Sequence, residues 1–463
     1  MIRLSPLRYL RLRAFDGSTE GGRAAERYRL AAWAVLANIF SKGMAMAVMV
    51  LSVSLTIPYL GAQRFGVWMT VASFATMLSL LGLGVGNALV NHVASRQASQ
   101  NPELLRRAIT GGLGFLMLIG LVVGAALFLL ATFLPWAALI KAEDPSLLTE
   151  ARDAARLFAV LFGVSLLTTG IQSVFAGLQR NFEVHLASTL GSLASLAALA
   201  LAAHLHAGVP TLLAGTFGIP LLTTLCLLGL LARRDLFSRN DIKLAVTKEA
   251  SGLLRIGGLF FVLQLGGMIG WGADALIISS ALGPAQVALY SIGQRLFQFI
   301  TQPLAMVNGP LWGAYADAKA KGDVGFIRRT LKLSMLGTLG ASLAGALVLF
   351  LASQPLLHYW TAGTVEAPVA LMGAMALWAV LESCGAAFAM FLNGVHVIRQ
   401  QVVVVVLFCV VVLPLKIIGI NQVGLIAIPL AAVLVYAATH LYFYGLVYYS
   451  GIKAIVTTAD QKT

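Results

Sequence analysis

Long apolar segments alternate with short polar connections along almost the whole chain. A bilayer core about 30 Å thick is crossed by a helix of about 20 mostly apolar residues. Such segments predict an all-α integral membrane protein with about twelve spans, at residues 31–57, 67–90, 109–134, 154–178, 185–206, 209–232, 256–281, 287–312, 333–353, 368–393, 402–420 and 423–446. The first segment is too long for the core of a signal peptide and has no clear cleavage site, so we expect it to be retained.

The two halves of this pattern resemble each other. Residues 60–68 align with residues 282–290 at an offset of 222, and the same ungapped offset places Arg106-Arg107 on Arg328-Arg329. An outer turn and an inner basic loop therefore repeat in one register. We expect two pseudo-symmetric six-helix bundles related by an axis along the membrane normal, with a cavity between them.

The repeat and the spans together define the predicted domains. They are a basic N-terminal segment at 1–30, an N-terminal six-helix bundle at 31–232, a linker at 233–255, a C-terminal six-helix bundle at 256–446 and a tail at 447–463.

Composition agrees with lipid as the main solvent of this protein. Of the 463 residues, 59% are hydrophobic and 11% are charged. Most of the 32 Lys and Arg fall on one side of the predicted spans, which places both termini in the cytoplasm because basic residues resist translocation. The net charge of +14 thus follows from topology. A nucleic-acid partner is not expected, since no basic soluble domain carries the charge.

Five ionisable residues lie inside predicted spans, where charge is costly and is often functional. Lys42 lies about 16 Å into the first span, near the midplane. Asp274 and Arg295 lie at similar depths on adjacent helices and could pair, either as a structural ion pair or with a role in ligand binding or coupling. Lys416 is close enough to a span end to snorkel to the interface, or it could bind substrate. Glu382 is a candidate coupling residue.

Other motifs carry less chemistry. Trp271, Tyr290 and Phe388 could stack on sugar rings, although aromatic residues near span ends are more often interface anchors. The sequence has no P-loop, nucleophile elbow or metal-ligand spacing, and the Gly82-x-Gly84-x-Gly86 run lies in an apolar span that predicts helix packing. We therefore expect no catalytic residue, no metal and no cofactor.

The segment from Asp274 to Tyr290, continued by Tyr315 to Asp323, resembles the second-half signature of Wzx-type flippases for polysaccharide repeat units. Residues 58–68 resemble the first-half signature. These flippases belong to the multidrug, oligosaccharidyl-lipid and polysaccharide exporter superfamily. Ala288 departs from the glycine usual in the family, which weakens the match of the second turn.

This resemblance implies a V-shaped transporter of the bacterial inner membrane. It would move undecaprenyl-diphosphate-linked oligosaccharide to the periplasmic leaflet by alternating access, for O-antigen or another surface polysaccharide, with a proton gradient, a sodium gradient or the membrane potential as driving force. A cationic lumen is implied, and Arg295 and Lys416 match it by span position; Lys42 rests on its depth alone. Membrane lipids, a polysaccharide polymerase and chain-length machinery would be partners.

Two alternatives stay open. One is a small-molecule or drug exporter of the same superfamily. The other is a membrane glycan polymerase or ligase, which would need a larger outer loop than residues 135–153 provide.

Overall fold

Helices account for nearly all of the chain that the structure describes. This computed structural model describes residues 20–79, 83–98, 101–141, 144–236, 272–320, 322–395 and 397–449, and no strand occurs among them. Eight stretches within these residues are long and apolar enough to cross a membrane. The predicted class, an all-α membrane protein, is confirmed.

The chain forms two compact units, and each is assembled from separate stretches. Unit 1 comprises Met1–Thr56, Leu81–Leu134 and Glu150–Gly258. Unit 2 comprises Ile57–Leu80, Pro135–Thr149 and Leu259–Thr463. Most of the predicted linker at 233–255 lies outside the described residues, so the predicted domain boundaries stay a prediction.

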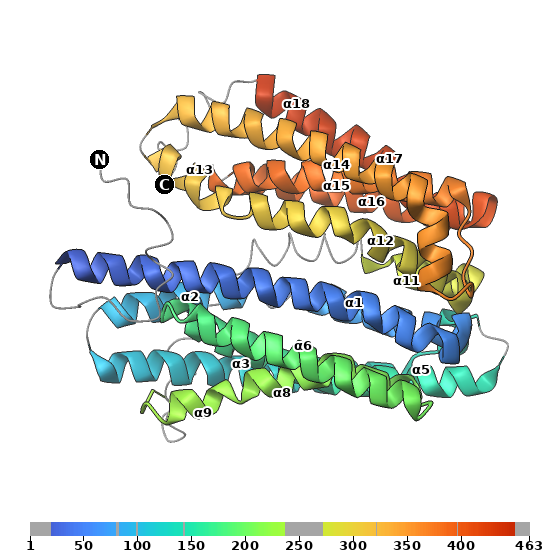
Figure 1. The fold of residues 1–463 in the computed structure, drawn as a ribbon, viewed down its shortest axis with the longest axis horizontal. Helices are drawn as coiled ribbons and strands as arrows, with labels where there is room; N and C mark the ends of the chain where they lie inside the picture. Colours follow the sequence, from blue (N-terminus) through green and yellow to red (C-terminus); the bar gives the residue numbers. More distant parts are fainter. Residues whose placement is uncertain are drawn as a thin grey trace. The chain divides into compact units, whose positions relative to one another are not determined.

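Unit 1 is a bundle of long helices that share one general direction (Figure 1). Its helices are the first part of α1 (Glu20–Ser79), α2 (Leu83–Ala98), α3 (Pro102–Phe133), most of α5 (Pro145–Gly177), α6 (Asn181–His204), α7 (Val209–Leu213), η3 (Ala214–Gly218), α8 (Ile219–Leu225) and α9 (Leu227–Ala232). Small residues let neighbouring helices approach: a Cβ added at Gly120 of α3 would lie 2.3 Å from the carbonyl oxygen of Gly163 in α5. Such close packing is typical of membrane helices.

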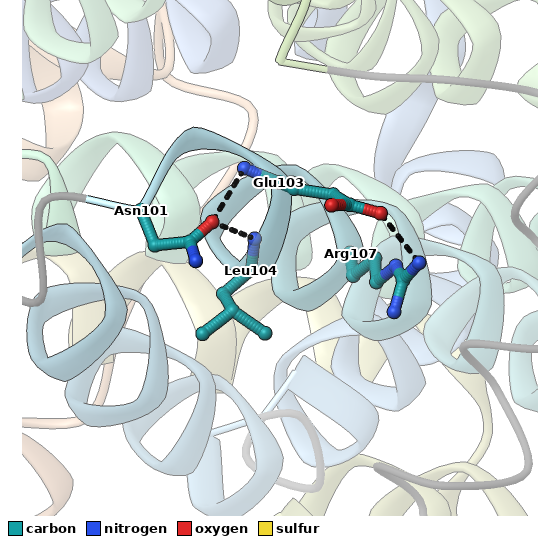
Figure 2. A network of polar contacts seen from close by, with 4 residues as sticks. All are labelled: Asn101, Glu103, Leu104 and Arg107. Carbon is teal, nitrogen blue, oxygen red and sulfur yellow. Dashed lines mark hydrogen bonds and ion pairs between the residues drawn. The ribbon is translucent and has the colours of Figure 1, made fainter.

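Helix α3 begins at a well-formed N-cap (Figure 2). The Asn101 side chain accepts hydrogen bonds from the backbone amides of Glu103 and Leu104, at 3.1 and 3.2 Å, and Pro102 follows it as the first helical residue. Arg107 pairs with Glu103 one turn later, at 2.5 Å. These are the residue types that start helices, which is why the polar sequence before the apolar segment already turns helical.

Unit 2 contains the rest of the described helices. They are α4 (Trp136–Leu139), α11 (Asp274–Leu282), α12 (Pro284–Asn308), α13 (Leu311–Ala320), α14 (Val324–Trp360), α15 (Val369–Gly394), α16 (Ile398–Val423), η5 (Gly424–Ile426), α17 (Ala427–Tyr436), η6 (Ala437–Leu441) and α18 (Tyr442–Tyr449), together with the end of α1. Helix α15 packs against both α12 and α14. A Cβ at Gly385 of α15 would overlap the Tyr436 hydroxyl, so glycine lets α17 lie close.

The two repeated turns have the same backbone conformation. Gly61 has φ 68° and ψ 172°, and Gly283, its counterpart at the offset of 222, has φ 86° and ψ 169°. Both angles lie where residues with a Cβ are strained. The turns also touch, because a Cβ added at Gly66 would meet the backbone of Pro284. The repeated turn thus has the same backbone form in both halves.

Helix lengths differ from the predicted spans in a systematic way. Helix α1 runs for 60 residues and joins the first predicted span to the start of the second through the non-helical Gly61. It ends at Ser79 and α2 begins at Leu83, so the predicted span 67–90 is divided between two helices. Hydropathy locates the apolar middle of a helix, whereas capping and turn residues decide its ends.

Candidate functional site

A buried ion pair joins two helices of unit 2. Lys416 of α16 places Nζ 2.5 Å from Oδ1 of Asp274, the first residue of α11. The Tyr290 hydroxyl on α12 donates to the other carboxylate oxygen, Oδ2, at 2.9 Å. Lys416 is 0% exposed, Tyr290 6% and Asp274 7%, so all three side chains are buried and each polar group has its partner within the cluster. We call these three residues the charge cluster.

The local sequence explains how Asp274 and Tyr290 meet. The left-handed Gly283 and the following Pro284 reverse the chain, so α11 and α12 run antiparallel. Asp274 lies nine residues before Gly283 and Tyr290 seven after it, and at about 1.5 Å per residue they reach similar depths. Lys416 comes from 142 residues further along. Its place beside Asp274 depends on how α16 packs against α11.

Two predictions about these charges are wrong. Asp274 pairs with Lys416 and not with Arg295. Arg295 lies five residues beyond Tyr290, about 140° further around α12, and therefore faces another side of the helix. Lys416 does not snorkel to the interface, because its ammonium group is fully buried against the carboxylate.

Arg295 is half-buried on α12 and faces the segment that follows the first repeated turn. Its Nη2 lies 3.2 Å from Sδ of Met69 in the last part of α1, which also belongs to unit 2. The contact joins positions 226 residues apart. Lys42 lies on α1 in unit 1, with an exposed side chain. The structure therefore brings Asp274 and Lys416 together, and it places Lys42 in the other unit.

Glu382 of α15 is exposed to open space inside unit 2. It lines two cavities, of about 260 Å³ and about 60 Å³, and Trp378 lines both with it. The larger cavity is also bounded by Tyr436 and His440, whose rings stack at 4.0 Å. In the part of the chain that the structure describes, Glu382 has no ion-pair partner. A carboxylate in this setting is suited to hold a proton or a small cation.

A polar stripe on α12 was not among the predicted site residues. Gln294, Gln298, Thr301 and Gln302 all line the smaller cavity with Glu382. Their spacing of three and four residues places them on one face of the helix. The signal was visible as amides recurring every fourth residue in a predicted span, and this polarity explains why α12 is not among the eight apolar stretches.

The three aromatic candidates for sugar stacking have different surroundings. Trp271 lies outside the described residues. Tyr290 lines the smaller cavity, but its hydroxyl is bound to Asp274. Phe388 is 4% exposed and stacks on Tyr444 with ring centroids 4.1 Å apart. Sugar stacking stays a prediction, and in this conformation the Phe388 ring is covered.

Comparison with known proteins decides the family. The family described as "Polysaccharide biosynthesis protein" matches residues 29–311, more than half of the chain. The chain belongs to the polysaccharide biosynthesis protein family. This family membership agrees with the resemblance found in the turn segments. A search of curated proteins finds no match.

Solved structures share the fold of the family member described here. An inward-facing multidrug resistance MATE transporter of the MOP superfamily aligns with a TM-score of 0.75 at 16% identity, covering 89% of this chain and 96% of that one. The lipid II flippase MurJ, in an inward closed conformation, aligns at 0.72 and 11% identity, covering 89% and 87%. A MOP superfamily transporter from Pyrococcus furiosus aligns at 0.64 and 13% identity, covering 93% and 97%. At these identities the likeness establishes the transporter fold alone.

Proposed function

We propose that this protein is a flippase for undecaprenyl-diphosphate-linked oligosaccharide. It moves the lipid from the cytoplasmic to the periplasmic leaflet of a bacterial inner membrane by alternating access, with both termini in the cytoplasm. The observation that carries the proposal is the family match over residues 29–311. The transporter fold, shared with a lipid II flippase, supports transport over polymerase or ligase chemistry.

The cationic groups would bind the diphosphate. Arg295 can present several N–H donors to phosphate oxygens, and such bonds are strong where water is scarce. Lys416 would change partners, leaving Asp274 for a phosphate oxygen when the helices rearrange. Asp274 would then take up a proton, because an unpaired carboxylate is costly in a buried setting. Substrate binding and proton uptake would thereby be linked.

Glu382 and Lys42 have secondary roles in this proposal. Glu382 would carry a coupling proton or sodium ion in the cavities of unit 2, since its carboxylate faces open space there. Lys42, exposed on α1, would contribute a further positive charge for the anionic headgroup. The amide stripe of α12 would offer hydrogen bonds to neutral ligand groups.

Reconstitution tests the proposal directly. The full-length protein is placed in proteoliposomes with lipid-linked oligosaccharide, and headgroup accessibility from outside is followed with and without a pH gradient. We expect translocation, and we expect Arg295→Ala to slow it at least about tenfold by removing charge-assisted bonds. Arg107→Ala, an exposed arginine paired with Glu103, is the matched control and should keep the wild-type rate.

The outcomes separate the function from the residue assignment. No translocation in either condition would count against a flippase. Translocation by Arg295→Ala at the wild-type rate would overturn the role of Arg295 and leave the function standing.

A second candidate is a small-molecule exporter, favoured by the fold likeness to a multidrug transporter. A deletion strain distinguishes the two. A flippase predicts loss of a surface polysaccharide with an unchanged drug-resistance profile, whereas an exporter predicts increased drug sensitivity with the polysaccharide retained.

A further inference from the structure

A cleft of about 610 Å³ opens at one end of unit 1. Its volume is within the range of about 300–1,000 Å³ typical of small-ligand sites. Its lining comes from α1, α2, the turn between α5 and α6, and the first turn of α6. The residues used below, which we call the arginine cleft, are Arg29, Trp33, Gln97, Gln179, Arg180 and Phe182.

The arginine cleft lies where membrane-spanning helices end. Arg29 lies just before the predicted first span at 31–57, and Trp33 lies in the first turn of that span. Gln97 is next to the last residue of α2, and Gln179 and Arg180 lie between the end of α5 and the start of α6. Tryptophan and arginine at such ends lie at the level of lipid headgroups. The predicted topology places this end on the cytoplasmic side.

The turn that carries Gln179 and Arg180 is held in a strained conformation. Gln179 has φ 58°, a left-handed value that costs a residue with a Cβ. The Arg180 amide donates to the Phe175 carbonyl at 2.8 Å, which closes the end of α5 around that residue. Helices normally use glycine at this position. Strain of this kind is often retained because the side chain is used.

Arg180 is oriented by a partner within the cleft. Its Nε donates to Oε1 of Glu183 at 2.7 Å, and Nη2 donates to the same oxygen. A guanidinium has five N–H donors, so these two bonds orient the group without using all of its donors. Arg29 on α1 brings a second guanidinium group to the lining of the cleft.

The aromatic side of the cleft suits the apolar part of a lipid. Trp33 of α1 and Phe182 of α6 meet edge to face, with ring centroids 6.4 Å apart and planes at 85°. Phe182 is 40% exposed. If the charged group of a ligand faces the arginines, the rings of Trp33 and Phe182 lie beside its apolar part.

We propose that the arginine cleft binds the phosphate-bearing headgroup of an anionic membrane lipid. Phosphate would accept bonds from Arg29 and Arg180, amides of Gln97 and Gln179 would bind the polar headgroup, and the Trp33–Phe182 pair would contact the start of the acyl chains. Basic pockets between membrane helices at the headgroup level bind anionic lipids in this manner. The inference concerns a resident lipid and does not rest on the flippase activity.

Binding is measured with the purified full-length protein in detergent, titrated with short-chain phosphatidylglycerol, with inorganic phosphate and with a short-chain uncharged glycolipid. We expect saturable binding of phosphatidylglycerol only. Arg180→Gln should weaken it at least about tenfold, as expected for lost hydrogen bonds to a charged group. Arg107→Gln, at the start of α3 and bound to Glu103, is the matched control and should bind within about twofold of wild type.

A second variant separates binding from folding. Gln179→Gly should raise the melting temperature, since glycine accepts the left-handed conformation, and should still weaken lipid binding because it removes the amide. Equal affinity of Arg180→Gln and wild type, equal weakening by Arg107→Gln, or equal binding of inorganic phosphate would each overturn the proposal.

Discussion

The two repeated halves place very different side chains on the same scaffold. At the offset of 222, Ser52 corresponds to Asp274 and Trp68 corresponds to Tyr290. Ser52 satisfies its hydroxyl within its own helix, by donating to the Met49 carbonyl at 2.7 Å. Asp274 cannot be satisfied locally, and it recruits Tyr290 and Lys416 from two other helices. The two positions share a place in the repeat, but only the second-half residue is a buried charge that needs partners from other helices.

The largest effect is expected when one member of the Asp274–Lys416 ion pair is removed. Lys416→Met should lower the free energy of unfolding by about 3–5 kcal/mol, because Asp274 stays buried without its counter-charge. Asp274→Ser combined with Lys416→Met, which copies the first-half residue, should restore most of that loss. Thermal unfolding of the single and double variants measures both. A single variant within about 1 kcal/mol of wild type would mean that the pair is not a buried unit.

A smaller loss is expected from the third member of the charge cluster. Tyr290→Phe removes only the hydroxyl that donates to Asp274 and should cost about 1.5–3 kcal/mol, the range for hydrogen bonds to charged groups. Tyr359→Phe is the matched control, because Tyr359 is 90% exposed. Equal effects of the two substitutions in unfolding experiments would contradict the assigned hydrogen bond.

The two turn glycines, Gly61 and Gly283, allow the two halves to be compared at the backbone. Each replacement by alanine puts a Cβ on a left-handed residue and should cost about 1–2 kcal/mol. Gly61 has open space around its Cβ position, whereas at Gly283 the Cβ would lie 2.9 Å from the Lys141 carbonyl oxygen. Gly283→Ala should therefore destabilise more than Gly61→Ala. The reverse order in melting temperature would contradict the closer contact assigned to the Cβ position of Gly283.

The smallest effect is a pH dependence near the first repeated turn. Hydrogen bonds from Ser146 lower the pKa of the exposed Asp144 carboxyl, with a further contribution from the charge of Arg64. A lowered folded-state pKa adds stability above the unfolded pKa of about 3.9, and this stability is lost as the pH falls through the folded value. Ser146→Ala should reduce that acid-side slope in a pH series of unfolding curves. An unchanged slope would contradict the role of Ser146.

Much of the fold followed from the sequence because lipid leaves few options. Backbone polar groups must be satisfied inside each apolar segment, so such segments are helical. The repeated Leu-Gly turns at 60 and 282 marked the reversals, because their glycines reach angles that other residues avoid. Intramembrane charge likewise singled out Asp274 and Lys416 before any contact was known.

The partners of those residues could not be predicted, for a physical reason. Depth along a helix is set by counting residues, but the direction of a side chain is set by the rotation of that helix against its neighbours. Asp274 and Arg295 matched in depth and yet face different sides.

The sequence by itself thus determined the helices, the duplicated turns and the charges that lie inside predicted spans. Only the tertiary structure decided that Lys416 neutralises Asp274 across 142 residues and that Arg295 faces Met69 across 226. It also gathered the amides of α12 around Glu382. These pairings depend on packing between helices far apart in the chain, and local sequence carries no record of that packing.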